Sequence, residues 1–506
     1  MRKFTLTFVL LAVALLTSCV KKEYITIETP EEPKDESTYT IMMYGCGGGN
    51  LDYSMAVNIQ EALQTGSTDR VKFTGQIKFS NAFQQYEAEG AAGTQRFIVG
   101  SEPVSWYWPE ETLPADLALY DPQTLTDFIN WSKEQCPADE YILLLWNHGG
   151  AWAPYDDGMD TSRGVIYDDV LDKVGLSLDS LVEGIKNSGT KMKMIYYDAC
   201  LMGMVEILSG LTECADYVLS ASHITPGMGG DYDSLIYHLN NSTNFEQSIQ
   251  NYCQDTMAHW NLQNTAFDLM LVDLSKMDQL LNEIKSFSSL MEEVVEIANR
   301  NKEAIEQEDE EIDINEAMIT LAFQEIINSV YAYEADIIPG TEFMSYPYFD
   351  LLNLAELFAS MNYATTYNAS FITIASRLNR AFDEAIVCKV LSNCLSGMGL
   401  SMGVAITDAN AWSTYTWDKY YPELKFDQVT GWSNWVSKNS FNPTGNPNPD
   451  SFANPSETPG SGEEGDEEGD EAGDEEGDEE GDGMDQEEIQ KQIFMQLVLQ
   501  IISSRN

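Results

Sequence analysis

Hydrophobic and polar residues follow two alternating patterns over residues 39–225. Short, almost wholly apolar runs predict buried strands, whereas segments between several of them repeat apolar residues every three to four positions, as amphipathic helices do. The predicted strands are residues 39–44, 71–79, 141–146, 192–197 and 217–221, and the predicted helices are residues 51–63, 125–133 and 176–185. Strands that alternate with helices indicate an α/β fold, a mainly parallel sheet with helices on both faces.

Beyond residue 240 the helical pattern dominates. The longest predicted helices are residues 245–260, 275–301 and 367–386, and further strands are predicted at 267–272 and 399–406. We therefore divide the folded part of the chain into a core at residues 39–240 and a helical C-terminal subdomain at residues 241–438 that adds strands to the core.

The C-terminal end of the chain changes character twice. Residues 439–462 are rich in Pro, Asn, Ser and Gly, and residues 463–485 repeat Gly, Asp and Glu without a basic residue. Such a composition cannot build a packed core, so residues 439–485 are predicted to be disordered. Residues 486–506 return to an apolar spacing at positions 489, 493, 497 and 501. This spacing predicts an amphipathic helix that either folds back on the core or docks on a partner.

The N-terminus has the pattern of an export signal. Two basic residues precede an apolar run at residues 4–16, which is too short to span a bilayer but typical of a signal peptide. The run ends in Leu-Thr-Ser-Cys19, which is similar to a bacterial lipobox, where the cysteine is acylated and becomes the first mature residue. We predict a signal peptide at residues 1–18, a tether at residues 19–38 and a lipid anchor on Cys19. The alternative is an ordinary signal peptide with a stray cysteine.

Net charge and cysteine spacing argue against several kinds of partner and site. The formal net charge of −55 argues against nucleic acid and anionic lipid surfaces as partners. No CxxC pair or HExxH run suggests a zinc site among the eight cysteines and four histidines, so we predict no metal centre. Cys388 and Cys394 are near each other in the chain and could pair, although spacing alone does not show it. The four glycines at positions 45 and 47–49 lack a following Gly-Lys-Ser/Thr, so they indicate a tight turn and no phosphate loop.

Two predicted strands end in reactive side chains followed closely by glycine. One strand runs into Asn-His148-Gly149-Gly, and the next runs into Asp198-Ala-Cys200-Leu-Met-Gly. In an open parallel sheet, sites form at the carboxyl ends of the strands, and consecutive strands are often neighbours. An imidazole beside a thiol can take its proton and later protonate a leaving amine. The pattern therefore predicts a Cys200–His148 catalytic dyad, with the Gly149 and Cys200 N–H groups as an oxyanion hole.

Each of these residues could also have a purely structural role. A lone cysteine at a strand end is usually a small core residue, and a histidine before glycine is often a turn residue. His223 is an alternative base, but we prefer His148 because it follows the strand beside the nucleophile strand. We interpret His223 as a solvated loop residue.

The motifs together resemble a known family. Trp-Asn-His148-Gly-Gly-Ala-Trp, followed about 50 residues later by Tyr-Asp198-Ala-Cys200-Leu-Met-Gly, is similar to the clostripain family of cysteine peptidases (family C11). The stretch from Ser220 to Asp231 and the late Gly-Leu-Ser at residues 399–401 extend the likeness over roughly residues 38–410. The resemblance implies a caspase-like α/β fold, a Cys–His dyad and endopeptidase cleavage after Arg or Lys.

The resemblance also suggests how a basic side chain would be recognised. Asp198 lies two residues before Cys200, so in an extended chain both point to the same side. The family pattern places such a carboxylate at the floor of the S1 pocket, with Asp231 as a second candidate acid; the alternative for Asp198 is a helix cap. Ser222 and His223 stand where the family usually has acidic or polar residues, and Gly230 replaces a common Trp. These departures leave the dyad better supported than the preference for Arg or Lys.

Family members often mature by cutting themselves between the histidine and the cysteine. Arg163 is the candidate scissile residue here, and the alternative is an uncut surface arginine. We expect a monomer, cut into two chains after processing, that acts on protein or peptide substrates. No cofactor is required by this chemistry, while the acid-rich loops permit the help from calcium that family members often receive. The rival interpretation is a non-catalytic surface-binding lipoprotein that keeps the caspase-like fold.

Overall fold

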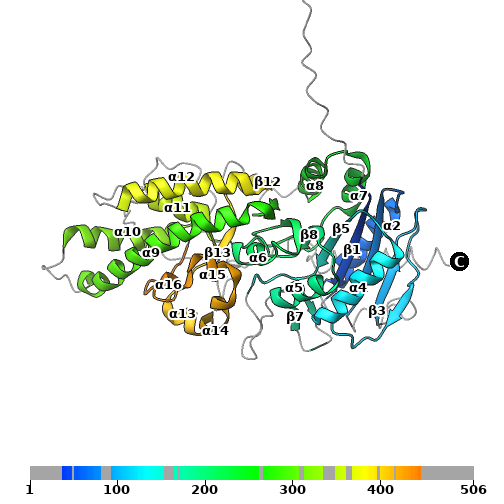
Figure 1. Ribbon diagram of the computed structural model, residues 1–506, viewed down its shortest axis with the longest axis horizontal. Coiled ribbons are helices and arrows are strands. Elements are labelled where there is room, and N and C mark those ends of the chain that lie inside the picture. Colours follow the sequence, from blue (N-terminus) through cyan, green and yellow to red (C-terminus); the bar gives the residue numbers. More distant parts are fainter. Residues whose placement is uncertain are drawn as a thin grey trace, which may run out of the picture. The chain divides into compact units, whose positions relative to one another are not determined.

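The structure is a computed structural model (Figure 1) that describes residues 37–47, 51–80, 93–152, 164–168, 171, 174–260, 266–306, 313–333, 348–360, 367–395, 399–414 and 417–445. Several predicted features lie outside the described residues: the signal peptide, Cys19, most of the tether, Arg163, the acidic segment and the predicted C-terminal helix. No described helix has both the length and the apolar character needed to cross a bilayer.

A mainly parallel sheet lies towards one end of the described region, and the long C-terminal helices extend away from it (Figure 1). Its strand order is β12-β10-β9-β8-β5-β1-β2-β3-β4. The central strands run parallel to one another: β9 (Ala215–Ser220), β8 (Met192–Asp198), β5 (Glu140–Trp146), β1 (Tyr39–Cys46) and β2 (Val71–Lys78). Antiparallel strands complete the edges: β10 (Asp268–Asp273) with β12 (Ile386–Leu391), and β3 (Thr94–Ile98) with β4 (Glu111–Leu113). The predicted α/β fold is confirmed.

The apolar strand runs are buried on both faces of the sheet. Every residue of β1 is buried; Ile41 and Met43 face one hydrophobic cluster, while Met42 and Tyr44 face the other. Burial stabilises each large apolar side chain by about 1.5–3 kcal/mol. A central parallel strand therefore needs an apolar run without polar alternation, which is the pattern these segments show.

Amphipathic helices cover the two faces. The helices of one face are α4 (Pro122–Gln135), α5 (Leu178–Asn187) and α6 (Val205–Gly210), and those of the other are α2 (Asp52–Thr65), α7 (Tyr232–Asn241) and α8 (Phe245–Trp260). Side-chain caps define where several of them begin. The Asp121 carboxylate accepts the Gln123 N–H at 2.8 Å ahead of α4, and Ser177 accepts the Ser180 N–H at 3.1 Å ahead of α5. The helices predicted from periodicity in this part of the chain are confirmed to within a few residues at each end.

The long C-terminal helices are inserted between two neighbouring strands of the sheet. The chain leaves β10 into α9 (Met277–Glu306), continues through α10 (Ile314–Ser329) and α11 (Leu351–Ser360), and returns through α12 (Tyr367–Ala385) directly into β12. Figure 1 shows α9, α10, α11 and α12 side by side, as their contacts require. One hydrophobic cluster continues from α4 and α5 into α9 and α12, so this helical region shares its core with one face of the sheet.

The described region also contains shorter elements. They are β6 (Val165–Asp168), β7 (Val174–Leu176), β11 (Tyr348–Asp350), β13 (Gly403–Ala405), α13 (Ala409–Thr414), α14 (Trp417–Tyr420), α15 (Lys425–Thr430), α16 (Ser433–Val436) and the 3₁₀ turns η1 (Leu274–Lys276), η2 (Asn393–Leu395) and η3 (Tyr421–Glu423). The strand predicted at residues 267–272 is β10 of the main sheet. The strand predicted at 399–406 is only the short β13, which pairs with β11 outside that sheet.

Candidate functional site

The ends of β5 and β8 bring His148 and Cys200 to one edge of the sheet. The two strands are parallel neighbours, and their last paired residues are Trp146 and Asp198. His148 and Cys200 each follow two positions later, so both chain segments leave the sheet at the same level. Neighbouring strands lie about 4.8 Å apart. The predicted adjacency of these two strands is therefore confirmed.

Gly149 packs directly against the backbone of Cys200. A Cβ atom at position 149 would lie 2.1 Å from the Cys200 carbonyl oxygen and 2.9 Å from its nitrogen, so a larger residue would displace that peptide. Gly149 also forms a β-bridge with Val165, and the N–H of the residue after Gly149 donates to the Gly164 carbonyl at 2.9 Å. The chain just after position 163 thus lies against the residues that follow His148.

The half-buried Cys200 side chain faces the backbone of Thr225. The Thr225 N–H donates to Sγ at 3.3 Å, and the thiol donates to the Thr225 carbonyl at 3.8 Å. An N–H directed at sulfur favours the thiolate, the reactive form. Sequence reasoning missed Thr225, since a backbone contact leaves no mark in the residue pattern.

A strained turn follows Cys200. Leu201 has φ of 59°, a left-handed conformation that costs a residue with a side chain about 1–2 kcal/mol. The Leu201 N–H donates to the His223 carbonyl at 3.1 Å, and the Gly203 N–H donates to the Ala221 carbonyl at 2.7 Å. The loop at residues 221–225 therefore holds both the turn and the sulfur of Cys200.

Burial sets the charge state of His148. Removal from water lowers the pKa of this imidazole below its ordinary value of 6.5. At neutral pH the ring is therefore uncharged, which is the form that accepts a proton. Its neighbours in the chain are anchored: the Asn147 amide donates to the Cys46 carbonyl at 2.5 Å, and Trp152 packs edge-on against Trp417 with ring centroids 4.9 Å apart.

Asp198 is buried at the end of β8. The Gly230 N–H at 2.7 Å and the Tyr232 hydroxyl at 2.8 Å both donate to Oδ2, and among the described residues no hydrogen bond ends on Oδ1. Burial raises the pKa of Asp198 to about 6, and the two hydrogen bonds oppose the rise. The alternative of a helix cap is not what the structure shows, because α6 begins after Met204 without a side-chain cap.

Asp231 caps α7 and lies near another carboxyl group, Glu61. The half-buried Asp231 accepts the Ser234 N–H at 3.2 Å. Glu61, on α2, accepts the Tyr232 N–H at 3.4 Å, and burial raises the pKa of Glu61 to about 7, with smaller contributions from the charges of Asp231 and Asp198. The sequence did not single out Glu61, because an acidic residue within an amphipathic helix has an ordinary place there.

Tyrosine side chains enclose Gly230. A Cβ atom at Gly230 would lie 2.1 Å from the Tyr252 hydroxyl and 2.5 Å from the Tyr196 hydroxyl, and these hydroxyls are hydrogen-bonded at 2.8 Å. Asn58 completes this wall, because it accepts the Trp146 indole N–H at 2.9 Å and donates to the Gly230 carbonyl at 3.0 Å. Aromatic residues from β8 and α8 therefore occupy the space beside Gly230.

The prediction that His223 is a solvated loop residue is wrong. Its side chain is fully buried, with Nδ1 2.6 Å from the Asp268 carboxylate and Nε2 2.7 Å from the Tyr331 hydroxyl. The error has a topological cause, because β10 runs antiparallel beside β9 and brings Asp268 under the loop that follows β9.

The remaining cysteines occupy the interior. Cys46, Cys136 and Cys214 are buried. The Cys388 thiol is hydrogen-bonded to Cys253, on α8. That bond lowers the pKa of Cys388, whereas burial raises the pKa of Cys253. The side chain of Cys394 lies outside the described residues, so its pairing with Cys388 stays a prediction.

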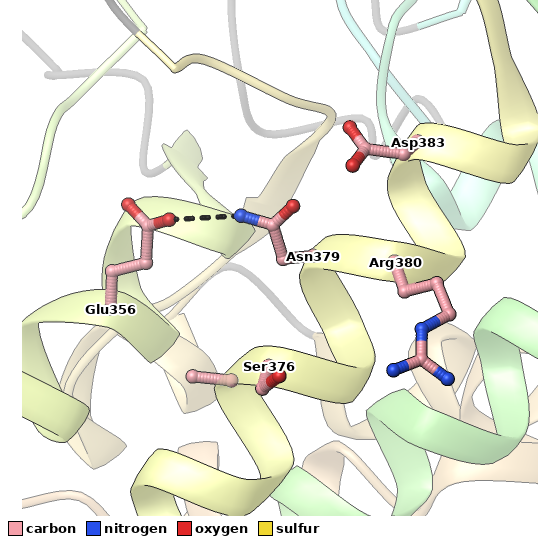
Figure 2. A pocket seen from close by; sticks show the side chains of 6 residues that line it. Glu356, Ser376, Asn379, Arg380 and Asp383 are labelled. Atoms are coloured by element: carbon pink, nitrogen blue, oxygen red, sulfur yellow. Dashed lines mark hydrogen bonds between the residues drawn. The ribbon is translucent and has the colours of Figure 1, made fainter.

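A polar groove on the helical region differs in character from these strand ends. It encloses about 460 Å³ between α11 and α12, and Figure 2 shows the side chains that line it. Glu356 accepts a hydrogen bond from the Asn379 amide at 3.3 Å, while Arg380 and Asp383 extend from the following part of α12. None of the residues predicted for catalysis lines the groove. In the part of the chain that the structure describes, no group of three or more His, Cys, Asp or Glu residues is placed to hold a metal ion.

The sequence of this chain is similar to that of known proteins. A model described as the clostripain family matches residues 92–438. Clostripain of Hathewaya histolytica is 24% identical over 413 residues, which span 72% of this chain and 73% of that protein.

Two solved structures share the fold. An inactive zymogen C11 protease from Parabacteroides distasonis has a TM-score of 0.54 at 15% identity, covering 78% of this chain and 98% of that one. A secreted C11 cysteine protease from Bacteroides thetaiotaomicron, in complex with an irreversible peptide inhibitor, has a TM-score of 0.54 at 16% identity, covering 78% of this chain and 99% of that one.

Proposed function

This chain belongs to the clostripain family of cysteine peptidases, and we propose that it cleaves peptide bonds after Arg and Lys with Cys200 as nucleophile and His148 as general base. The observation that carries the proposal is the pairing of β5 with β8, which sends both residues out of the same sheet edge with Gly149 packed on the Cys200 peptide. A neutral imidazole can accept the thiol proton, and the Thr225 N–H directed at sulfur favours the thiolate, so both features support Cys200 as a nucleophile.

The chemistry proceeds in two steps. His148 accepts the Cys200 proton, and Sγ forms a bond to the carbonyl carbon on the amino-terminal side of the scissile bond. The N–H groups of Gly149 and Cys200 stabilise the negative oxygen of this tetrahedral intermediate. His148 then donates its proton to the leaving amine as the C–N bond breaks, and a thioester remains on Cys200. Water, deprotonated by His148, hydrolyses the thioester and restores the thiol.

We assign Asp198 to recognition of the basic side chain, with Asp231 as a second acid. Oδ1 of Asp198, which accepts no hydrogen bond from the described residues, suits an Arg or Lys partner, since Oδ2 already carries two hydrogen bonds from the protein. Glu61 adds a third carboxyl group near the loop at residues 229–232. This gathering of acids supports a basic substrate side chain over an acidic or apolar one.

Peptide hydrolysis tests the main proposal. The processed, reduced enzyme should hydrolyse short fluorogenic peptides that end in Arg or Lys, and a basic chloromethylketone should label Cys200. Cys200→Ala should remove both activities, whereas Cys136→Ala, at a buried thiol after α4, should retain them. Absence of turnover together with absence of labelling in the wild type would overturn the peptidase assignment and favour the surface-binding alternative.

We further propose that the protein is exported and held at a bacterial membrane, at the periplasmic face or the cell surface, by lipid on Cys19. The supporting pattern is the basic, apolar and Leu-Thr-Ser-Cys order of residues 2–19. A labelled fatty acid should enter the wild type and not Cys19→Ala, which should also leave the membrane fraction. Retention of label by the variant would contradict the lipid anchor.

We also propose that catalysis by Cys200 and His148 requires no cofactor and that calcium acts only as an aid to it. A chelator should therefore leave turnover of the peptide substrates measurable. If a chelator abolishes turnover and added calcium restores it, the enzyme requires calcium and this proposal is wrong.

A further inference from the structure

A buried network of Asp268, His223 and Tyr331 lies next to the loop that holds Cys200. Both nitrogens of the His223 ring are hydrogen-bonded, Nδ1 to Asp268 at 2.6 Å and Nε2 to Tyr331 at 2.7 Å. The ring is 0% exposed and Asp268 is 2% exposed. With both nitrogens engaged and no solvent contact, His223 is not placed to exchange protons with a substrate.

Asp268 holds the backbone of the same loop as well as the ring. Its carboxylate accepts the N–H groups of Ser222 and His223, each at 2.9 Å, in addition to the imidazole. Three hydrogen bonds on one buried carboxylate fix the direction of the chain immediately after β9.

From this anchored position the loop makes several contacts with the nucleophile turn, including the thiol bond to the Thr225 carbonyl and a bond from the Ser222 hydroxyl to the Gly203 carbonyl at 3.1 Å. The His223 carbonyl accepts the Leu201 N–H at 3.1 Å, the Ala221 carbonyl accepts the Gly203 N–H at 2.7 Å, and the Thr225 N–H reaches the Cys200 sulfur at 3.3 Å. Leu201 keeps its left-handed φ only while its surroundings hold it. The loop is therefore the element that sets where the sulfur lies.

The far end of the network is fixed in the helical region. Tyr331 follows α10, its N–H donates to the Asn353 side chain at 2.9 Å, and its carbonyl accepts the Asp350 N–H at 2.9 Å. The Tyr333 ring packs edge-on against His223 with centroids 4.8 Å apart. The imidazole thus joins the loop after β9 to the segment between α10 and β11.

We propose that His223 is a positioning residue for Cys200: the Asp268–His223–Tyr331 network holds residues 221–225 so that the Thr225 N–H points at the sulfur. This inference rests on the proposed function in taking Cys200 as the nucleophile. It predicts that loss of the imidazole changes the reactivity of the thiol while substrate binding at the Asp198 side is retained.

The test compares His223→Gln with the wild-type full chain. A glutamine cannot reach both Asp268 and Tyr331 with the geometry of the ring. We expect kcat for an Arg peptide to fall about 10- to 100-fold, because a small displacement of a reacting atom has effects of that size, with KM changed less than about threefold. The pH midpoint for alkylation of Cys200 by iodoacetamide should move upward by about half a unit or more, since the thiolate loses a directed N–H.

Two further variants make the comparison specific. Tyr331→Phe removes one hydroxyl and should shift kcat and the alkylation midpoint in the same direction by a smaller amount. His238→Gln breaks another His–Asp pair, in which Nε2 lies 2.6 Å from Asp255 on α8, and should change neither quantity. Thermal unfolding and near-UV circular dichroism establish that each variant is folded, and if His223→Gln is not, Tyr331→Phe decides.

The outcomes separate this inference from the proposed function. A folded His223→Gln protein with wild-type kcat and alkylation midpoint overturns the positioning role, as does an equal loss in His238→Gln. If the wild type shows no peptidase activity, the proposed function fails, and the alkylation profiles still decide: an upward shift supports positioning, and an unchanged midpoint rejects it.

Discussion

Asp198 is the residue whose charge should decide substrate preference. Its pKa, raised by burial to about 6, means that it is ionised above that pH and neutral below it. A basic side chain binds the ionised form, so KM for Arg peptides should rise as the pH falls through about 6. Asp198→Asn should lower kcat/KM for Arg peptides about 100-fold, since losing one partner of a buried charge pair costs about 2–5 kcal/mol, and should remove this pH dependence of KM.

Asp231 provides the matched comparison for Asp198. Asparagine caps helices as well as aspartate does, so Asp231→Asn removes the charge and keeps the start of α7 intact. We expect kcat/KM to change less than about fivefold, because the Asp231 carboxylate is already turned to the Ser234 N–H. A large loss in Asp231→Asn with little change in Asp198→Asn would exchange their roles.

For single residues, the sequence predicts which side chains are reactive better than it predicts which residues surround them. The spacing of His148 and Cys200 after apolar runs was enough to place them at one sheet edge, because parallel strands fix that geometry locally. The partners of His223 come from positions 45 and 108 residues further along the chain, and no local pattern announces them. Burial of this histidine was therefore beyond sequence reasoning.

At the scale of elements, two strand ends and one glycine form the core of the site. Gly149→Ala adds a Cβ atom that would overlap the Cys200 carbonyl, so the two strand ends must separate. We expect kcat to fall by at least about 100-fold, because displacement of the Cys200 peptide misplaces both the sulfur and an oxyanion donor. The measurement is steady-state hydrolysis of an Arg peptide.

Gly100→Ala is the control for this substitution. A Cβ atom at Gly100 meets nothing within 4 Å, so activity and unfolding temperature should stay near those of the wild type. If Gly149→Ala also keeps wild-type activity, the close packing of the two strand ends has no catalytic importance.

The elements differ in how well their patterns predict them. The central strands and the long helices were predicted because burial on two faces or on one stripe imposes a clear period on the sequence. Strands β3 and β4 were missed because neither gives an apolar run: β3 buries the polar residues Thr94, Gln95 and Arg96, and the edge strand β4 is partly exposed along its length. The strand expected at residues 399–406 is only partly confirmed, because only Gly403–Ala405 form a strand, and it pairs with β11 outside the main sheet.

For the whole molecule, Glu206 couples the nucleophile side of the sheet to the C-terminal region. This fully buried carboxylate on α6 accepts the Ala405 N–H at 2.8 Å and the Tyr421 hydroxyl at 2.9 Å. Burial raises the pKa of Glu206 to about 7, so the folded state favours the protonated acid. Its contribution to stability is complete below about pH 4.5 and is lost as the pH rises through about 7.

Glu206→Gln should therefore change how stability depends on pH. The wild type should lose about 3 kcal/mol from this group between pH 5 and pH 8, which corresponds to a fall of about 5 °C in unfolding temperature. In Glu206→Gln that part of the fall should be absent, as measured by thermal unfolding across this range. Glu213→Gln, at an exposed carboxylate paired with Lys186, should keep the wild-type slope; equal slopes in all three proteins would contradict the assignment.

Processing between His148 and Cys200 is the prediction that involves the whole chain. Gly164 and Val165 lie against Gly149 and the residue after it, so the described segment that follows position 163 is already held beside the His148 strand end of its own molecule. If Arg163 is the scissile residue, the wild type should become two chains at a rate independent of protein concentration, while Cys200→Ala and Arg163→Ala should stay intact. Two chains in Cys200→Ala would show that another protease makes the cut, and a rate that rises with concentration would show cleavage between molecules. Because the segment after the cut remains bridged to Gly149, the processed enzyme should keep both chains together under native conditions and release them only on unfolding.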